Sequence, residues 1–321
     1  MDRNFGDSLL SGRSPWIQLL VSLFYIFIIG GGLLVILYLP AMVLFEPTDN
    51  LLEDLSVVPT VKDVGFLFYL MISQHISVFI IPGFILITKL RNNRNEGYTM
   101  FVNPGWPSIK SVVLLTICIF PLLAFSEELI MLIKFPEWLP GLVSWIKERE
   151  MLNEKLFNSY FIYKNFLFVI LNIIMMLVLP ALGEELIFRG VIQPILGRLF
   201  RSDYTAIIVT AVIFSALHLE FTGFLQRFIL GALCGLVYLW SGNLWLPAAI
   251  HFTNNVFAVL AGYAQDPSHT PVPEPGYNIV ILGIFMLLML IPALKILSKL
   301  RKKYSPVQQA EYQSLDQTHY V

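Results

Sequence analysis

The chain has 321 residues, of which 56% are hydrophobic and 13% are charged, and its net charge is −1. Soluble domains usually carry about 25% charged residues, so this composition excludes an ordinary soluble protein and indicates lipid as the main solvent. The small net charge gives no general attraction to nucleic acid, and we expect no nucleic-acid partner. The two cysteines, Cys118 and Cys234, both lie in apolar segments, which argues against a disulfide framework or a thiolate metal site.

Eight apolar segments are long enough to cross a membrane as helices, for which about 20 residues are needed. In chain order they are residues 16–45, 64–88, 111–133, 162–196, 204–222, 224–241, 244–263 and 277–298. The first is longer than the roughly 7–15-residue apolar core of a cleavable signal, so we expect it to remain as a membrane anchor. The sequence therefore predicts an all-α fold, a polytopic membrane bundle of about eight transmembrane helices.

The charges between these segments predict the orientation of the chain. Lys and Arg precede the first segment and follow the second, fourth and eighth, whereas the connection between the first two is acidic. The basic residues are Arg3, Arg13, Lys89, Arg91, Arg94, Arg198, Arg201, Lys299, Arg301, Lys302 and Lys303, and the acidic ones are Glu46, Asp49, Glu53, Asp54 and Asp63. We expect an integral membrane protein with both termini in the cytoplasm. The compact loops and the lack of a targeting signal favour a bacterial inner membrane.

The expected organisation has four parts. Residues 1–160 hold the first three spans and an outer loop, and residues 161–265 form a core of four spans. Residues 266–304 hold the last span, and residues 305–321 form a polar cytoplasmic tail that we expect to be disordered.

The connection over residues 135–161 mixes Lys147, Arg149 and Lys155 with apolar residues at helical spacing. An amphipathic helix lying in the outer membrane interface would explain this mixture. An ordinary solvated loop is the alternative, and the sequence favours neither.

Three polar clusters lie inside the core spans, although a charge at the bilayer centre costs at least about 2.5–3.5 kcal/mol. On a helix, Glu185 and Arg189 are four residues apart and face each other, so we expect Arg189 to neutralise Glu185. Glu184 lies about 100° around the helix and lacks a local partner, so it can point into a cavity as a general base or acid. The clusters comprise Glu184, Glu185 and Arg189 in the fourth span, His218 in the fifth, and His251 and Asn255 in the seventh.

Two chemistries remain open for these residues. At a rise of about 1.5 Å per residue, Glu184, His218 and His251 can meet near the middle of the membrane. Together with Asn255 they could activate a water and hold an oxyanion. Alternatively, Glu184, His218 and His251 could bind zinc or another divalent metal, because two imidazoles, one carboxylate and an open position form a known catalytic zinc site.

Other polar residues are interpreted as structural or solvated. His75 in the second span has no carboxylate or asparagine at helical spacing, and the Glu127–Glu128 pair has no arginine four or five residues later. His269 and His319 lie in a polar loop and in the tail.

The three clusters resemble the motifs of the CAAX-protease and bacteriocin-processing (CPBP) family over about residues 165–262. Glu184-Glu185-x-x-x-Arg189 resembles EExxxR, Phe214-x-x-x-His218 resembles FxxxH, and His251-x-x-x-Asn255 resembles HxxxN. The resemblance implies an all-helical intramembrane endopeptidase with a cavity open to the cytoplasm. It implies that Glu184 and His218 act on a water and that His251 and Asn255 stabilise the oxyanion. It leaves open whether a metal takes part.

The expected function is hydrolysis of a peptide bond in a membrane-associated peptide or protein. A non-catalytic immunity or scaffold protein of the same family would instead bind a peptide without cutting it. A proton-coupled transporter would also use buried Glu and His residues, but no inverted repeat is visible in the sequence.

Overall fold

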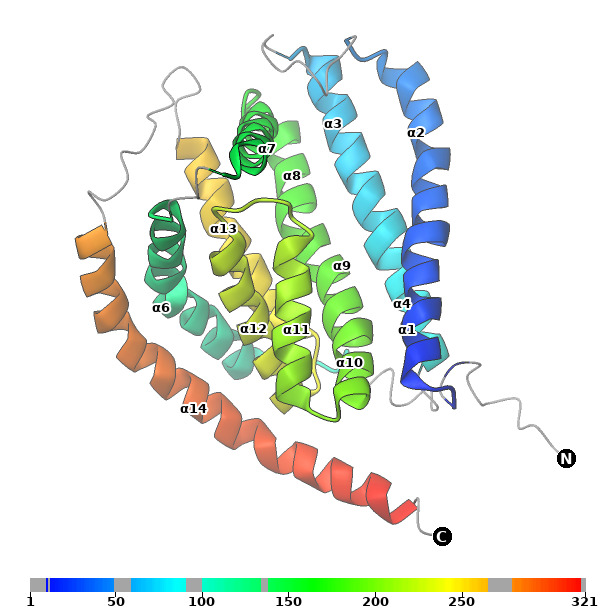
Figure 1. Cartoon of the computed structure of the whole chain (residues 1–321), viewed down its shortest axis with the longest axis vertical. Helices are drawn as coiled ribbons and strands as arrows, with labels where there is room; N and C mark the ends of the chain where they lie inside the picture. The colour runs from blue at the N-terminus through cyan, green and yellow to red at the C-terminus, as the bar shows by residue number, and fades with distance from the viewer. Residues whose placement is uncertain are drawn as a thin grey trace, which may run out of the picture.

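The computed structural model describes residues 10, 12–48, 59–90, 100–133, 138–264 and 279–318, with side chains as far as residue 304. All elements in these ranges are helical, and the long helices run alternately up and down a single bundle (Figure 1). They are α1 (Pro15–Phe24), η1 (Tyr25–Gly30) and α2 (Gly31–Phe45); α3 (Val61–Gln74), η2 (His75–Ile80) and α4 (Ile81–Leu90); α6 (Trp106–Met131); α7 (Pro140–Ser159); α8 (Phe166–Asn172), η3 (Ile173–Val178), α9 (Leu179–Ile187), η4 (Phe188–Ile192) and α10 (Gln193–Phe200); α11 (Asp203–Ala216); α12 (Phe224–Ser241); α13 (Trp245–Ala264); and α14 (Ile279–Thr318).

The predicted all-α membrane bundle is confirmed. Among the described residues, six helices are long and apolar enough to cross a membrane, and α11 and α13 correspond to the other two predicted segments. The six are Pro15–Phe45, Val61–Leu90, Trp106–Met131, Phe166–Phe200, Phe224–Ser241 and Ile279–Tyr304. Four short stretches, η1 to η4, are π-helical and lie inside the first, second and fourth of these helices.

The predicted fifth span, residues 204–222, is too long. The helix α11 ends at Ala216, and His218 lies in the turn that follows it. Leu219 has a left-handed backbone with φ of 52°, which a continuing right-handed helix cannot accommodate. His218 is therefore held by a turn and not by a helix.

The disordered tail predicted from residue 305 is also corrected. The last helix, α14, continues to Thr318. Pro306 lies inside this helix, and the residues after it, 307–318, contain no Gly or Pro and are rich in residues that favour helix.

The third connection forms a helix, α7 (Pro140–Ser159), across one end of the bundle, where the sequence had left a helix and a loop open. Figure 1 shows α7 end-on, whereas its neighbours run along the bundle. The Glu150 carboxylate accepts a hydrogen bond of 3.0 Å from the backbone N–H of Thr222, which ties α7 to the turn after α11. Its location in a membrane interface stays a prediction, and residues 134–137 lie outside the described part of the chain.

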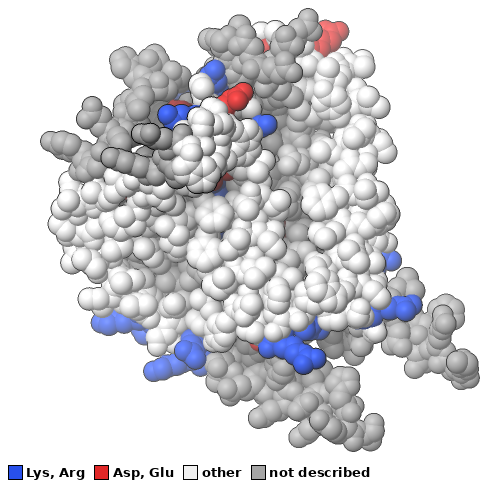
Figure 2. Space-filling view, in the orientation of Figure 1, with Lys and Arg blue, Asp and Glu red and all other residues white. Residues whose placement is uncertain are grey.

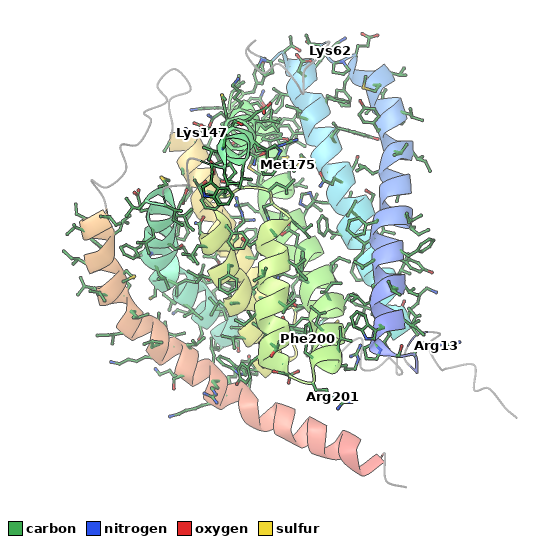
Figure 3. The ribbon with its side chains drawn as sticks, viewed as in Figure 1. Arg13, Lys62, Lys147, Met175, Phe200 and Arg201 are labelled. Atoms are coloured by element: carbon green, nitrogen blue, oxygen red, sulfur yellow. The ribbon has the colours of Figure 1, made fainter. Side chains whose placement is uncertain are left out.

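The described charges gather at the two ends of the bundle. Figure 3 shows Arg13 and Arg201 at one end and Lys62 and Lys147 at the other. In Figure 2, Lys and Arg line the edge near the ends of α10 and α14, and the surface between the two ends is largely uncharged. Arg3, Arg91, Arg94, Asp49, Glu53, Asp54, His269 and His319 lie outside the residues whose side chains are described.

Close packing brings η2 and α4 against α9. A Cβ added to Gly183 would lie 3.0 Å from Cβ of Phe79, and one added to Gly83 would lie 3.1 Å from Cβ of Leu186. Larger residues at these two positions would push the helices apart, so the glycines bring the second and fourth spans together beside Glu184.

We predict that the basic end of the bundle faces the cytoplasm, because basic loops favour that side. The first residues of α1 and the last of α14 lie at this end in Figure 1, so a C-terminal fusion should report the cytoplasm, and a reporter inserted after Gly141 should report the opposite side. Paired fluorescent-protein and alkaline-phosphatase fusions would measure this. A phosphatase that is active at the C-terminus would contradict the orientation.

Candidate active site

A buried ion pair forms the centre of the polar core. Nη1 of Arg189 lies 2.9 Å from Oε1 of Glu185, and both side chains are 1% exposed. The pairing predicted from the four-residue spacing is therefore present. Nη2 of Arg189 donates a 2.8 Å hydrogen bond to the carbonyl of Gly231 in α12, and the guanidinium lies 5.3 Å from the Phe214 ring centre. The pair thus joins the fourth span to α11 and α12.

The neighbouring carboxylate, Glu184, faces two imidazoles from other helices. Its Oε1 lies 3.6 Å from Nε2 of His75, and its Oε2 lies 3.9 Å from Nε2 of His251. The residue is 8% exposed, and its Oε2 makes no hydrogen bond with the described protein atoms. Buried polar atoms normally have a hydrogen-bond partner, so this oxygen is suited to receive one from a water or a substrate.

Three imidazoles are oriented in the same way around this region. In each, Nδ1 contacts an acceptor, so Nδ1 carries a hydrogen and Nε2 is left for another contact. The contacts are His75 Nδ1 with the Met71 carbonyl at 2.8 Å, His218 Nδ1 with the Phe214 carbonyl at 2.8 Å, and His251 Nδ1 with Oε1 of Glu185 at 3.1 Å.

The phenylalanine of the second motif is an aromatic wedge between the polar groups. The Phe214 ring centre lies 5.0 Å from that of His218, 5.8 Å from that of His251 and 5.2 Å from that of Phe188. Stacking and edge contacts at these distances stabilise ring orientations. Phe214 therefore contacts both histidine rings and the Arg189 guanidinium, and helps to orient these three groups.

The two predicted histidines, His218 and His251, lie at different distances from the Glu184 carboxylate. Among the described side chains, those of His75 and His251 lie within 4.0 Å of its carboxylate, and that of His218 lies farther away. The reason is the early end of α11, which leaves His218 in the turn beyond the helix.

Asn255 contacts a carbonyl that a proline leaves free. Pro180 has no N–H to donate to the carbonyl of Met176, four residues earlier in the same helix. Nδ2 of Asn255 donates a 2.9 Å hydrogen bond to that carbonyl. A neighbouring helix thus satisfies the carbonyl, as is usual for prolines in membrane spans. One N–H of the Asn255 amide remains for another acceptor, and its oxyanion role stays a prediction.

The donor set does not fit the metal site that the sequence left open. Glu184 and His251 carry atoms that divalent metals bind, but His218 lies beyond their immediate contact. In the part of the chain that the structure describes, no three His, Cys, Asp or Glu side chains are arranged to hold an ion.

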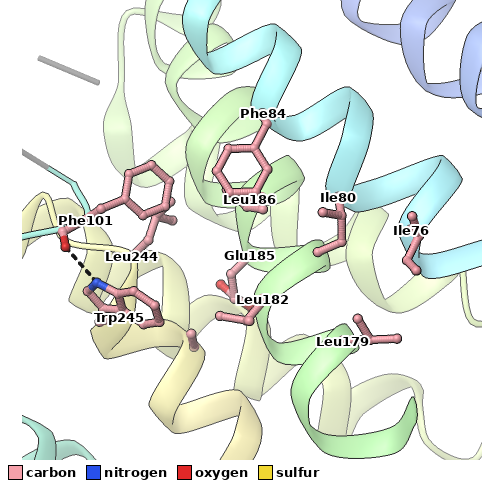
Figure 4. Close-up of a pocket in the computed structure, with 11 residues that line it drawn as sticks. Ile76, Ile80, Phe84, Phe101, Leu179, Leu182, Glu185, Leu186, Leu244 and Trp245 are labelled. Atoms are coloured by element: carbon pink, nitrogen blue, oxygen red, sulfur yellow. Dashed lines mark hydrogen bonds between the residues drawn. The ribbon is translucent and has the colours of Figure 1, made fainter. Parts of the chain in front are cut away.

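An apolar cavity of ≈ 330 Å³ lies over α9, between the η2–α4 helix and the start of α13 (Figure 4). Glu185 is the charged residue among the eleven that line it, and Ile76, Phe84 and Trp245 form an exposed rim. Nε1 of Trp245 donates a 2.8 Å hydrogen bond to the carbonyl of Phe101, which fixes the ring at this rim. The cavity offers an apolar group a place beside the polar core.

His75 is the residue that the sequence interpretation missed. Its own helix offers no carboxylate or asparagine at helical spacing, whereas Glu184, which it contacts, comes from another span. Its position near the middle of the Val61–Leu90 helix was the available signal, because the same criterion of depth selected His218 and His251.

Fold and site define a membrane-embedded helical protein with a buried carboxylate–imidazole centre. Residues 166–257 match the family described as type II CAAX prenyl endopeptidase Rce1-like, which confirms the resemblance seen in the motifs. The matched segment contains Glu184, His218, His251 and Asn255.

One curated relative matches part of the same chain. The uncharacterized protein YpbD of Bacillus subtilis (strain 168) is 36% identical over 85 residues, which cover 25% of this chain and 40% of that protein. The match thus spans about two fifths of the relative's length. No solved structure matches the chain.

We predict that Glu185→Gln destabilises the protein, because it leaves Arg189 buried without its counter-charge. Removing one partner of a buried pair costs about 3–5 kcal/mol. Arg189→Met should cost a similar amount, and the double variant should recover part of the loss because it removes both charges. Melting temperatures in detergent would measure all three. A Glu185→Gln variant as stable as the parent protein would show that the pair is not a stabilising element.

Proposed function

We propose that the chain is an intramembrane endopeptidase that hydrolyses a peptide bond of a membrane-associated peptide or protein. The observation that carries this proposal is the buried Glu184 carboxylate, whose Oε2 is free of hydrogen bonds with the described atoms and faces Nε2 of His251 at 3.9 Å. Ionisable side chains are rare inside a membrane, and those that occur there usually belong to functional sites. The Rce1-like family match supports a protease.

In the proposed reaction, Glu184 acts as the general base and His218 helps to hold the water. Glu184 takes a proton from the water, and the resulting hydroxide forms a bond to the carbonyl carbon of the substrate. The tetrahedral intermediate then collapses, the C–N bond breaks, and Glu184 returns the proton to the leaving amine. The free N–H of Asn255 and a protonated His251 are the proposed donors to the oxyanion.

The proposed substrate has an apolar part. The cavity beside Glu185 has an apolar lining and an exposed rim, which suits a hydrophobic side chain or a lipid-like group. The matched family is described as a prenyl endopeptidase, so a prenylated peptide is the first substrate to test and its unmodified form is the second.

We predict that Glu184→Gln abolishes cleavage and leaves the protein folded. Glutamine keeps the shape of the side chain but cannot take the proton, and a neutral group is easier to bury than a carboxylate. The measurement is cleavage of internally quenched peptides, farnesylated and unmodified, by purified protein, with melting temperature as the control for folding.

Two outcomes would contradict the proposal. Normal cleavage by Glu184→Gln would remove Glu184 from the role of base. A wild-type protein that binds these peptides and cleaves none of them would favour the non-catalytic scaffold.

We also predict that cleavage survives exhaustive chelation, because the described donors do not converge into a three-ligand centre. The measurement is the rate after treatment with EDTA and with 1,10-phenanthroline, together with elemental analysis of the purified protein. Loss of activity that stoichiometric zinc restores would replace the glutamate-only mechanism with a metal-dependent one.

A further inference from the structure

We propose that His75 is a positioning residue of this site, which holds Oε1 of Glu184 so that Oε2 stays directed at the water. The inference rests on the proposed function and adds a residue from outside the matched 166–257 segment. The 3.6 Å approach of its Nε2 to Oε1 of Glu184 carries the proposal.

The ring of His75 is fixed on its own helix. Its Nδ1 donates to the Met71 carbonyl at 2.8 Å, and the Phe79 ring lies 5.7 Å away at an interplanar angle of 30°. The residue is 5% exposed. The Met71 carbonyl and the Glu184 carboxylate can both only accept, so the ring makes the two favourable contacts with a hydrogen on each nitrogen, and Nε2–H is the group presented to the carboxylate.

The backbone geometry of the second span positions the His75 ring near Glu184. His75 begins the π-helical stretch η2, and π-helical insertions occur frequently at functional sites. Gly183 precedes Glu184 and has no Cβ, and this lets Phe79 of η2 pack closely against α9. The same local irregularity and the same glycine therefore bring His75 within reach of Glu184.

Each oxygen of Glu184 then has its own imidazole. His75 lies at Oε1 and His251 lies at Oε2. The terminal torsion of a glutamate side chain is broad, so a contact on one oxygen restricts where the other points. Without His75 the carboxylate plane can turn, and a misplacement of about 1 Å at a reacting group can cost about 10²-fold in rate.

The test uses two substitutions, one that can replace the contact of Nε2 and one that can replace only the contact of Nδ1. His75→Gln can place an amide N–H near the position of Nε2 and should keep the contact with Glu184. His75→Asn is shorter, so it can reach the Met71 carbonyl but not the carboxylate. Ser77→Ala is the matched control, because Ser77 is fully buried in the same π-helical stretch and its backbone contacts Gly30.

With full-length protein and the farnesylated quenched peptide, we expect His75→Asn to lower kcat by about 10- to 100-fold and to change KM by less than about twofold. His75→Gln should recover most of kcat, and Ser77→Ala should match the parent protein. Equal kcat values for His75→Asn and Ser77→Ala would overturn the inference while the proposed function stands.

A second measurement does not depend on activity. In protein labelled with ¹⁵N-histidine, the Nε2 resonance of His75 should shift when Glu184 is replaced by Gln, and the Ser77→Ala variant should leave it in place. An unchanged resonance would overturn the inference even if His75→Asn fails to fold. If the resonance shifts on the Glu184→Gln substitution but the wild-type protein cleaves neither peptide, the contact is supported and the proposed function is refuted.

Discussion

The buried ion pair between Glu185 and Arg189 is the interaction on which the core of this protein depends. Two charges at depth in a membrane are tolerated when they neutralise each other and when their remaining polar atoms find partners. Three other elements contact this pair: the Gly231 carbonyl of α12, the Phe214 ring of α11 and Nδ1 of His251 in α13. Oε2 of Glu185 and Nε of Arg189 make no hydrogen bond with the described atoms. The contacts of one ion pair thus join four spans.

Departures from regular α-helix supply the other polar contacts. The π-helical stretches η2, η3 and η4 contain His75, the Met176 carbonyl and Arg189, respectively, and each group makes a contact with a different helix. A regular α-helix uses its carbonyls internally, so a carbonyl becomes available to a neighbour where that pattern is broken. Pro180 adds to this effect because it frees the Met176 carbonyl for Asn255. The irregular geometry of the spans is therefore part of how the site is built.

The features that the sequence predicted correctly are those decided by residues close together in the chain. The apolar lengths of the spans and the four-residue spacing of Glu185 and Arg189 are local properties, and the structure contains both. The end of α11 was missed because the left-handed backbone at Leu219 decides it. The continuation of α14 to Thr318 was missed because the polar composition after residue 305 was interpreted as disorder. The contact of His75 with Glu184 joins two spans with no shared sequence pattern, so spacing within one helix gives no sign of it.

Two adjacent glutamates can have different roles because of the angle between them. Successive residues on a helix point about 100° apart, so Glu185 meets Arg189 while Glu184 turns toward the imidazoles. His251 links the two, since its Nδ1 donates to Glu185 and its Nε2 faces Glu184. The ion pair thus orients the ring that lies against the proposed base, and a change at Glu185 alters that ring as well as the stability of the core. Loss of cleavage on substituting Glu185 would for this reason follow from its structural role and would not mark it as a second base.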